Sequence, residues 1–150
     1  MCPNNVSMVD ISEKPVVKRV ATAAGKIVLT KNTINTIKEG KIKKGDPLIV
    51  GEIAAINAIK LTPQLIPLTH QIPITNIEFK THINEFSVEV NVTVTTIAQT
   101  GVEMEALIGV STFLNVIWDM TKYLEKDKQG QYPNTKIMDI RVINKQKMNP

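Results

Sequence analysis

Hydrophobic and polar residues alternate most clearly between positions 86 and 95, where Phe or Val occupies every second position. A period of two predicts a β-strand with one buried face. A shorter alternation of the same kind covers residues 77–83, and Asn84-Glu85 provides a turn between the two segments. The region is therefore expected to form a β-hairpin.

A helical pattern covers residues 101–126, GVEMEALIGVSTFLNVIWDMTKYLEK. Apolar residues occupy most of the circumference, which predicts a helix buried in a core or an interface. Ser111, Asn115, Asp119 and Lys122 fall within an arc of roughly 80° at about 100° per residue. Because unpaired polar groups are costly to bury, this stripe is expected to face water, a partner or a pocket.

Two shorter helices are expected between a first strand at residues 19–30 and the hairpin. Asn32 can cap one that runs to Glu39 and ends at Gly40. Asp46-Pro47 starts the other, which runs to about Leu61, because a capping carboxylate followed by proline favours a helix start.

A last strand is expected at residues 137–144, with Met138, Ile140 and Val142 on one face. The complete order is β-α-β-β-α-β, which predicts an α+β fold, the ferredoxin-like sandwich. Its antiparallel sheet carries the helices on one face. The other face is expected to be polar or covered by another subunit.

One domain is expected over residues 1–150, because this length and a hydrophobic fraction of 43% suffice for a core. Residues 1–7 are predicted to be a loose tail, and residues 126–135 a solvated surface loop. The single Cys2 excludes a disulfide scaffold and suits a cytoplasmic location. Neither a secretory signal nor a segment long enough to span a membrane is expected.

The net charge of +4 is unevenly distributed. Residues 1–60 carry +5, residues 61–119 carry −5, and residues 120–150 carry +4. Such blocks indicate either an anion site with carboxylates beside it or simply two differently charged faces, and charge alone favours the second.

Asp119 and Lys122 are three positions apart on the predicted long helix, so their side chains can touch. They form either a structural ion pair or an acid–base pair. In the second case partial burial would lower the pKa of the lysine while the carboxylate raises it. His70 lies in a stiff, proline-broken segment and has either a structural role or a role in a site, whereas His82 is expected to be solvated.

Lys43 and Lys44 precede a helix start, which suits either a phosphate site or a solvated basic loop. Lys60 reads as a cation at a helix end. Glu103 and Glu105 are two positions apart, so at most one is expected to share a pocket with Asp119. No His or Cys has companions at metal-ligand spacing, so a metal site is not expected.

Several stretches together resemble one family, the cyclic pyranopterin monophosphate synthases of molybdenum cofactor biosynthesis, known as the MoaC family. These stretches are MVDISEKP (8–15), KKGD (43–46), AAINAIK (54–60), LIPLTHQIP (65–73), TGVEMEAL (100–107), WDMTK (118–122) and DIRV (139–142). They follow one another across nearly the whole chain, and TGVEMEAL and the LIPL-x-H loop are highly specific.

The resemblance implies a cytosolic lyase. Its substrate would be 3′,8-cyclo-7,8-dihydroguanosine 5′-triphosphate, and its products cyclic pyranopterin monophosphate and pyrophosphate. It implies no resident cofactor, and it leaves open a divalent cation such as Mg²⁺ with the phosphates. The partners implied are the small nucleotide-derived substrate and further copies of the chain, in a homohexamer built as a trimer of dimers with sites between subunits. No nucleic acid or membrane partner is implied.

By position, the resemblance makes Asp119 and Lys122 the catalytic pair, with Lys44 assisting. Substrate-binding positions would be Leu68, Thr69, His70, Met104, Glu105, Lys60, Glu103 and Lys145, and Asp10 and Arg19 also match family positions. Three departures are visible, and one of them is a loop from Lys126 to Thr135 that is longer than expected for most members. Thr69-His70-Gln71 replaces the usual Cys-His-Pro, and QKMNP replaces the usual Gly-Gly-Lys-Ser tail.

Two other classes of protein fit the sequence less well. A nucleic-acid-binding module would need aromatic residues on the sheet, and the predicted strands supply only Phe79 and Phe86. A non-catalytic sensor of small anions would have no need of a carboxylate–lysine pair.

Overall fold

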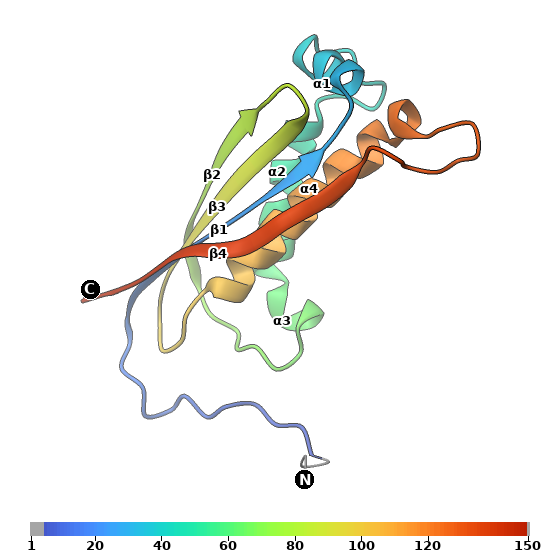
Figure 1. The fold of residues 1–150 in the computed structure, drawn as a ribbon. Coiled ribbons are helices and arrows are strands. Elements are labelled where there is room, and N and C mark those ends of the chain that lie inside the picture. The colour runs from blue at the N-terminus through green and yellow to red at the C-terminus, as the bar shows by residue number, and fades with distance from the viewer. Residues whose placement is uncertain (1–4, 150) are drawn as a thin grey trace.

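The computed structural model describes residues 5–149 and confirms the ferredoxin-like α+β fold (Figure 1). Residues 1–4, which include Cys2 and part of the expected tail, lie outside the described residues, as does residue 150. The elements follow the chain as β1 (Val17–Val28), α1 (Lys31–Lys38), α2 (Pro47–Lys60), α3 (Thr62–Leu65), β2 (Ile74–Ile83), β3 (Ser87–Ala98), α4 (Glu103–Glu125) and β4 (Lys136–Met148).

The sheet has the strand order β2-β3-β1-β4, and every neighbouring pair is antiparallel. Helices α2 and α4 cover one face of it, and α4 runs along β1 and β4 (Figure 1). The N-terminal segment and α3 lie near the first turn of α4, whereas α1 and the loop 126–135 lie near its last turn. The two ends of α4 therefore face different parts of the chain.

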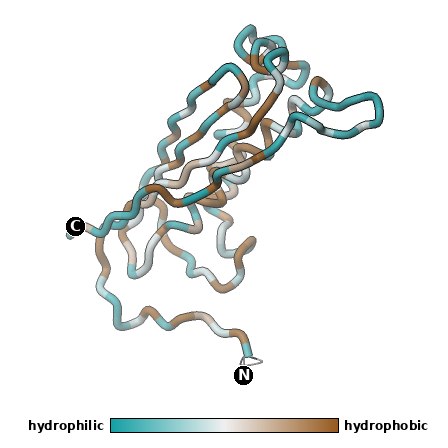
Figure 2. The backbone as a smooth tube through the Cα atoms, in the orientation of Figure 1, coloured by the Kyte–Doolittle hydropathy of each residue, from teal (hydrophilic) through white to brown (hydrophobic). Residues whose placement is uncertain are grey.

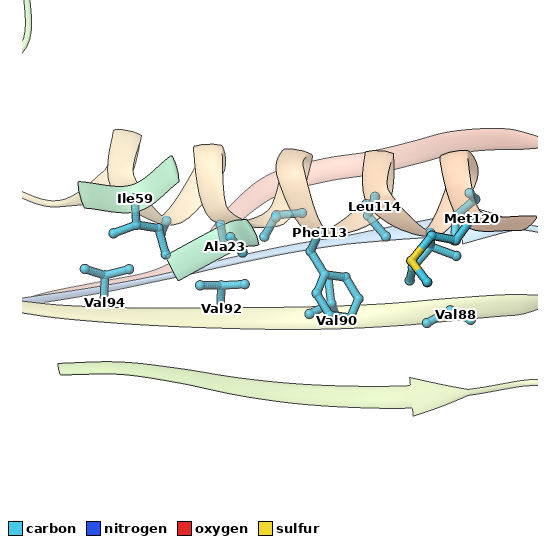
Figure 3. Close-up of a cluster of buried hydrophobic side chains, with 14 of the residues drawn as sticks. Ala23, Ile59, Val88, Val90, Val92, Val94, Phe113, Leu114 and Met120 are labelled. Carbon is cyan, nitrogen blue, oxygen red and sulfur yellow. The ribbon is translucent and has the colours of Figure 1, made fainter. Parts of the chain in front are cut away.

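The core lies between β3 and α4 (Figure 3). Val88, Val90, Val92 and Val94 are fully buried and point toward α4, where Val90 lies next to Phe113, as their alternation predicts. Burial of each such side chain contributes about 1.5–3 kcal/mol to folding. Chain segments of high hydropathy accordingly lie inside the layers, whereas the loop 126–135 and the end of β4 are hydrophilic (Figure 2).

Phe86 does not share this burial, so its place in the predicted strand was wrong. Its side chain is exposed, and the residue belongs to the turn that precedes β3. The backbone N–H of Asn84 donates to the carbonyl of Ser87 at 2.8 Å, which closes the turn one residue later than the predicted Asn84-Glu85 turn.

The predicted cap of α2 is confirmed, because Asp46 Oδ1 accepts a hydrogen bond from the N–H of Leu48 at 2.9 Å and Pro47 occupies the first turn. The cap of α1 is Thr30, two residues before the predicted Asn32. Its hydroxyl is available because the backbone of Thr30 is still extended where β1 ends. Gly40 follows α1 with a positive φ of 68°, a conformation that favours glycine.

The predicted single apolar face of β4 is wrong. Asp139 has a positive φ of 59°, and the pairing of β4 with β1 shifts between Ala24 and Lys26. Ile140 approaches Gly25 from the side of α4, whereas Met138 pairs with Lys26, the next residue of β1. Because adjacent residues of a strand point to opposite faces, the bulge places Met138 and Ile140 on different faces.

A buried carboxylate joins the end of α4 to the rest of the fold. Glu125 accepts hydrogen bonds from the hydroxyls of Thr30 and Thr135, both at 2.7 Å, and from the hydroxyl of Thr33. The backbone N–H of Thr30 donates to the same carboxylate at 3.2 Å. The network ties α4 to the start of α1 and to the segment that enters β4.

We expect Glu125→Ala to lower the free energy of unfolding by about 2–4 kcal/mol, because it leaves several buried donors without an acceptor. Urea unfolding followed by circular dichroism measures the change. The matched control is Glu39→Ala, which removes an exposed carboxylate that pairs only with Lys41 and should cost less than about 1 kcal/mol. Equal changes for the two variants would contradict the role given to Glu125.

Among residues 5–149, the structure contains no helix long and apolar enough to cross a membrane.

Candidate active site

Three charged side chains meet near the last turns of α4. Asp119 Oδ1 lies 3.0 Å from Nζ of Lys122, one helical turn away, and Asp119 Oδ2 accepts a hydrogen bond from Nζ of Lys44 at 2.8 Å. We call Lys44, Asp119 and Lys122 the ion cluster. It holds two ammonium groups on one carboxylate, so it can receive an anion.

The loop between α1 and α2 brings Lys44 to this place. The N–H of Lys43 donates to the hydroxyl of Tyr123 at 3.0 Å, and the Lys43 ammonium lies 4.9 Å from the centre of the Tyr123 ring. Gly45 follows with a φ of 116°, and Asp46 then caps α2. The loop is thereby fixed on α4 on one side and on α2 on the other.

The ion cluster changes the acidity of its members. Hydrogen bonds from Lys44 and then Lys122 lower the pKa of Asp119 below its usual value. The hydrogen bond to Asp119 raises the pKa of Lys122, and the nearby Tyr132 adds to the effect more weakly. In this chain Lys122 therefore holds its proton at neutral pH, which makes it a proton donor or a cationic anchor at the start of a reaction.

The ion cluster opens onto a cavity of about 490 Å³, which we call the Lys122 cavity. It is lined by Asn115, Trp118, Asp119, Lys122, Tyr132 and Ile137. The side chains of Lys122 and Asp119 are 43% and 52% exposed, so the partial burial expected to lower the pKa of Lys122 is not found in a single chain. The carboxylate of Asp119 instead determines the direction in which the pKa of Lys122 shifts.

A second cavity, of about 280 Å³, lies at the other end of α4. We call it the His70 cavity; it is lined by Val9, Ile11, Lys14, Leu68, Thr69, His70, Ile72, Thr100, Gly101, Glu103, Met104 and Glu105. The ring Nε2 of His70 lies 2.7 Å from the carbonyl of Val9, and the Thr69 hydroxyl donates to the carbonyl of Ile66 at 2.8 Å. The first contact holds the proline-broken segment against the N-terminal segment, and the second closes a turn within the proline-broken segment itself. His82, in contrast, is exposed on β2, as expected.

Glu103 and Glu105 both line the His70 cavity, and neither lines the Lys122 cavity. This agrees with the expectation that at most one of them shares a pocket with Asp119, since within one chain neither does. Both sit in the first turn of α4, where a cavity at the end of the helix touches residues on more than one side.

The two glutamates differ in their surroundings. Burial is the largest single influence on Glu103 and raises its pKa, but the hydrogen bond from Lys145, a backbone hydrogen bond and the charges of Lys145 and Arg19 together outweigh burial and lower the pKa. Burial raises the pKa of Glu105, and the charge of Glu103 adds to this shift. A side chain at Gly101 would collide with the Glu103 carboxylate, so the glycine leaves room for the Glu103–Lys145 pair.

Three more of the predicted positions lie near this end of the molecule. Lys60 lines an adjoining cavity of about 180 Å³ together with Glu105. The guanidinium of Arg19 donates to the carbonyls of Ala98 at 3.1 Å and Gln99 at 3.3 Å, in the segment that leads into α4. Asp10 accepts a hydrogen bond from the N–H of Ser12 at 2.9 Å.

The predicted site residues thus form two groups that one chain does not bring together. Met104 and Asp119 are separated by about 22 Å along the helix axis at a rise of about 1.5 Å per residue. A catalytic acid or base must come within hydrogen-bond distance of the reacting group. Within a single chain, the ion cluster cannot act on a group held beside His70.

The fold and these two cavities define a ferredoxin-like α+β protein with a carboxylate–lysine cluster at one end of a buried helix and a pocket lined by both acidic and basic side chains at the other. The chain matches the MoaC family over residues 8–147. Among residues 5–149 there is no group of three or more His, Cys, Asp or Glu side chains that could hold a metal ion.

Several relatives are about half identical to the chain. A protein of Methanosphaerula palustris named "Probable cyclic pyranopterin monophosphate synthase" is 54% identical over 142 residues, which cover 95% of this chain and 92% of the relative. One of Aeropyrum pernix with the same name is 49% identical over 144 residues, or 96% and 99% of the two chains. A protein of Methanothermobacter thermautotrophicus, 50% identical over 143 residues (95% and 90%), is named "Probable cyclic pyranopterin monophosphate synthase accessory protein". The chain belongs to the MoaC family, a family of enzymes.

Proposed function

We propose that the protein is a cytosolic cyclic pyranopterin monophosphate synthase. It would convert 3′,8-cyclo-7,8-dihydroguanosine 5′-triphosphate to cyclic pyranopterin monophosphate and release pyrophosphate. The observation that carries this proposal is the ion cluster, because it joins the family motifs KKGD and WDMTK through one carboxylate in a cavity. The names of the relatives support the same activity.

The ion cluster suits the proton transfers that this conversion needs. Opening of the purine-derived ring requires an acid and a base in turn. Closure of the cyclic phosphate requires a hydroxyl to lose its proton as its oxygen attacks the α-phosphorus, while the bond to the β-phosphate oxygen breaks and pyrophosphate leaves. We assign the main acid–base role to Lys122, which starts protonated. Asp119 orients it, and Lys44 assists a later step.

The His70 cavity suits substrate binding. Lys60 in the adjoining cavity and Lys145 beside Glu103 supply positive charge for phosphate groups, and His70, whose Nε2 is held by the Val9 carbonyl, presents the rest of its ring to the cavity. Leu68, Thr69 and Met104 shape the cavity, and Glu103 and Glu105 add carboxyl groups for the donors of a guanine-derived ring. In this proposal, cations and carboxylates from the differently charged blocks of the sequence lie side by side in one site.

We further propose that the complete site forms between chains of a homo-oligomer, a hexamer built as a trimer of dimers. The separation of the two cavities supports sharing, because the ion cluster of one chain can meet the His70 cavity of another. Exposed apolar residues support association: on α2, Ile49 is 58%, Val50 41% and Ile53 57% exposed. The apolar side chains Ile140, Val142 and Ile143 are also exposed on the edge strand β4.

The test is incubation of the purified protein with the cyclic GTP-derived intermediate. We expect a pterin product, detected by fluorescence after oxidation, and one pyrophosphate per pterin. Parallel reactions with EDTA and with added Mg²⁺ measure whether a divalent cation takes part. Absence of both products under all three conditions, in protein that is folded and oligomeric, would overturn the proposed function.

A further inference from the structure

An aromatic pair forms one wall of the Lys122 cavity. The rings of Trp118 and Tyr132 have centroids 5.1 Å apart and planes inclined by 60°, a tilted arrangement that aromatic side chains favour. Both residues line the cavity together with Asp119 and Lys122. Trp118 comes from α4, whereas Tyr132 comes from the loop 126–135. No residue of this loop has a role in the function proposed above.

This loop has a defined structure that holds Tyr132 in place. Asp127 Oδ1 accepts hydrogen bonds from the N–H groups of Gln129 and Gln131, both at 2.9 Å. The N–H of Asp127 donates to the carbonyl of Gln131 at 2.9 Å. At the far end of the loop, the hydroxyl of Thr135 is fixed on the buried Glu125. Tyr132 lies between the two anchored points.

The chemistry of the cavity indicates what its aromatic wall contacts. Lys44 and Lys122 attract the anionic part of a ligand, but two aromatic rings offer no donors or acceptors for phosphate beyond one hydroxyl and one indole N–H. Aromatic faces instead bind flat heterocycles, with little dependence on the edge groups of the ring. A proton donor at Lys122 must also lie within hydrogen-bond distance of the ring it acts on.

We propose that Tyr132, packed on Trp118, is a substrate-contacting residue that holds the fused guanine-derived ring against the ion cluster. The inference rests on the proposed function for the identity of the substrate. In this proposal the loop 126–135 positions the substrate ring beside Lys122. Tyr132 contacts that ring with its aromatic face more than with its hydroxyl.

Two probes separate a ring contact from a phosphate contact. GTP carries the heterocycle and the triphosphate but lacks the extra ring of the substrate, and inorganic tripolyphosphate carries the phosphates alone. By calorimetry, Tyr132→Ala should weaken GTP binding about ten-fold and leave tripolyphosphate binding unchanged. Tyr132→Phe should stay within about two-fold of the unmodified protein for both probes because it keeps the ring.

Two further variants complete the design. Tyr132→Leu keeps an apolar side chain on Trp118 without an aromatic face, and it should lose GTP binding as Tyr132→Ala does. Gln131→Ala is the matched control, since it changes the neighbouring residue of the same loop, which does not line the cavity, and it should bind both probes normally. Trp118 is the only tryptophan of the chain, so a change in its emission on GTP binding places the ligand at this wall.

The turnover assay separates the two proposals. If the unmodified protein forms the pterin and Tyr132→Ala changes neither KM nor GTP affinity, the contact is wrong and the function stands. If no pterin forms but GTP binding depends on the Tyr132 ring, the function is wrong and the ring site stands. No turnover together with no GTP binding would overturn both. Equal losses in Tyr132→Phe and Tyr132→Ala would also contradict a contact through the ring.

Discussion

Lys122→Ala is expected to lower kcat about 10²–10⁴-fold, the usual loss when a general acid or base is removed. The reason lies in the ion cluster, where Asp119 holds the ammonium 3.0 Å away and raises its pKa. Removal of the amine leaves the ion cluster with one cation, Lys44, and takes away the group that starts protonated. Steady-state kinetics with the cyclic GTP-derived intermediate, on protein of unchanged oligomeric state, measure the loss.

Two companion variants show whether the proton or only the charge matters. Lys122→Arg keeps a positive charge but cannot give up its proton at any ordinary pH, so it should remain as slow as the alanine variant. Lys128→Ala removes an exposed lysine of the loop 126–135 and should leave kcat unchanged. Recovery of activity by the arginine variant would show that Lys122 contributes only its positive charge and not a proton transfer. Normal turnover by Lys122→Ala would remove it from the mechanism.

The direction of the pKa shift adds a pH dependence to this prediction. Because Asp119 raises the pKa of Lys122, its replacement by asparagine lowers that pKa. Lys122 then loses its proton at a lower pH, and the alkaline limb of the kcat profile should move to lower pH in Asp119→Asn. An alkaline limb that stays in place would show that it reports a different group.

The elements with strong local signals were predicted correctly. The alternation in β3 and the capped start of α2 depend on neighbouring residues, and both are found in the structure. The errors concern Phe86 and the face of β4, where tertiary geometry overrides the local pattern. The turn between β2 and β3 includes Phe86, one residue more than predicted. The bulge at Asp139 places Met138 and Ile140 on different faces of the sheet, where a regular strand would have them on the same face.

In the candidate site too, contacts between residues close in sequence could be predicted, whereas contacts between residues far apart in sequence could not. The Asp119–Lys122 contact follows from a spacing of three on a helix. The contact of Lys44 with Asp119 joins residues 75 positions apart and was not predicted; the family resemblance only assigned Lys44 to the same site. Glu125 has no local signal, because its three hydroxyl partners come from two other segments. Tyr132 stands in a polar loop, where nothing in the pattern distinguishes it from a solvated tyrosine.

The second large effect is expected when two inactive variants are mixed. Lys122→Ala damages only the ion cluster, and the double variant His70→Ala/Lys60→Ala damages only the His70 end. If each site combines the ion cluster of one chain with the His70 cavity of another, random mixing at 1:1 makes about one quarter of the sites intact. Activity should therefore rise from near zero to about a quarter of the normal value.

The experiment needs oligomers that contain both chains, obtained by co-expression with two different affinity tags and purification on both. The matched control mixes Lys122→Ala with Asp119→Ala. Both changes lie in the ion cluster, so every site of the mixed oligomer keeps a defective cluster and activity should stay near zero. Recovery in the first mixture alone is the expected result, since about 22 Å of α4 separates the two groups in one chain. If neither mixture recovers, or both recover equally, the two cavities do not join between chains, and the role of the His70 end in the same reaction is wrong.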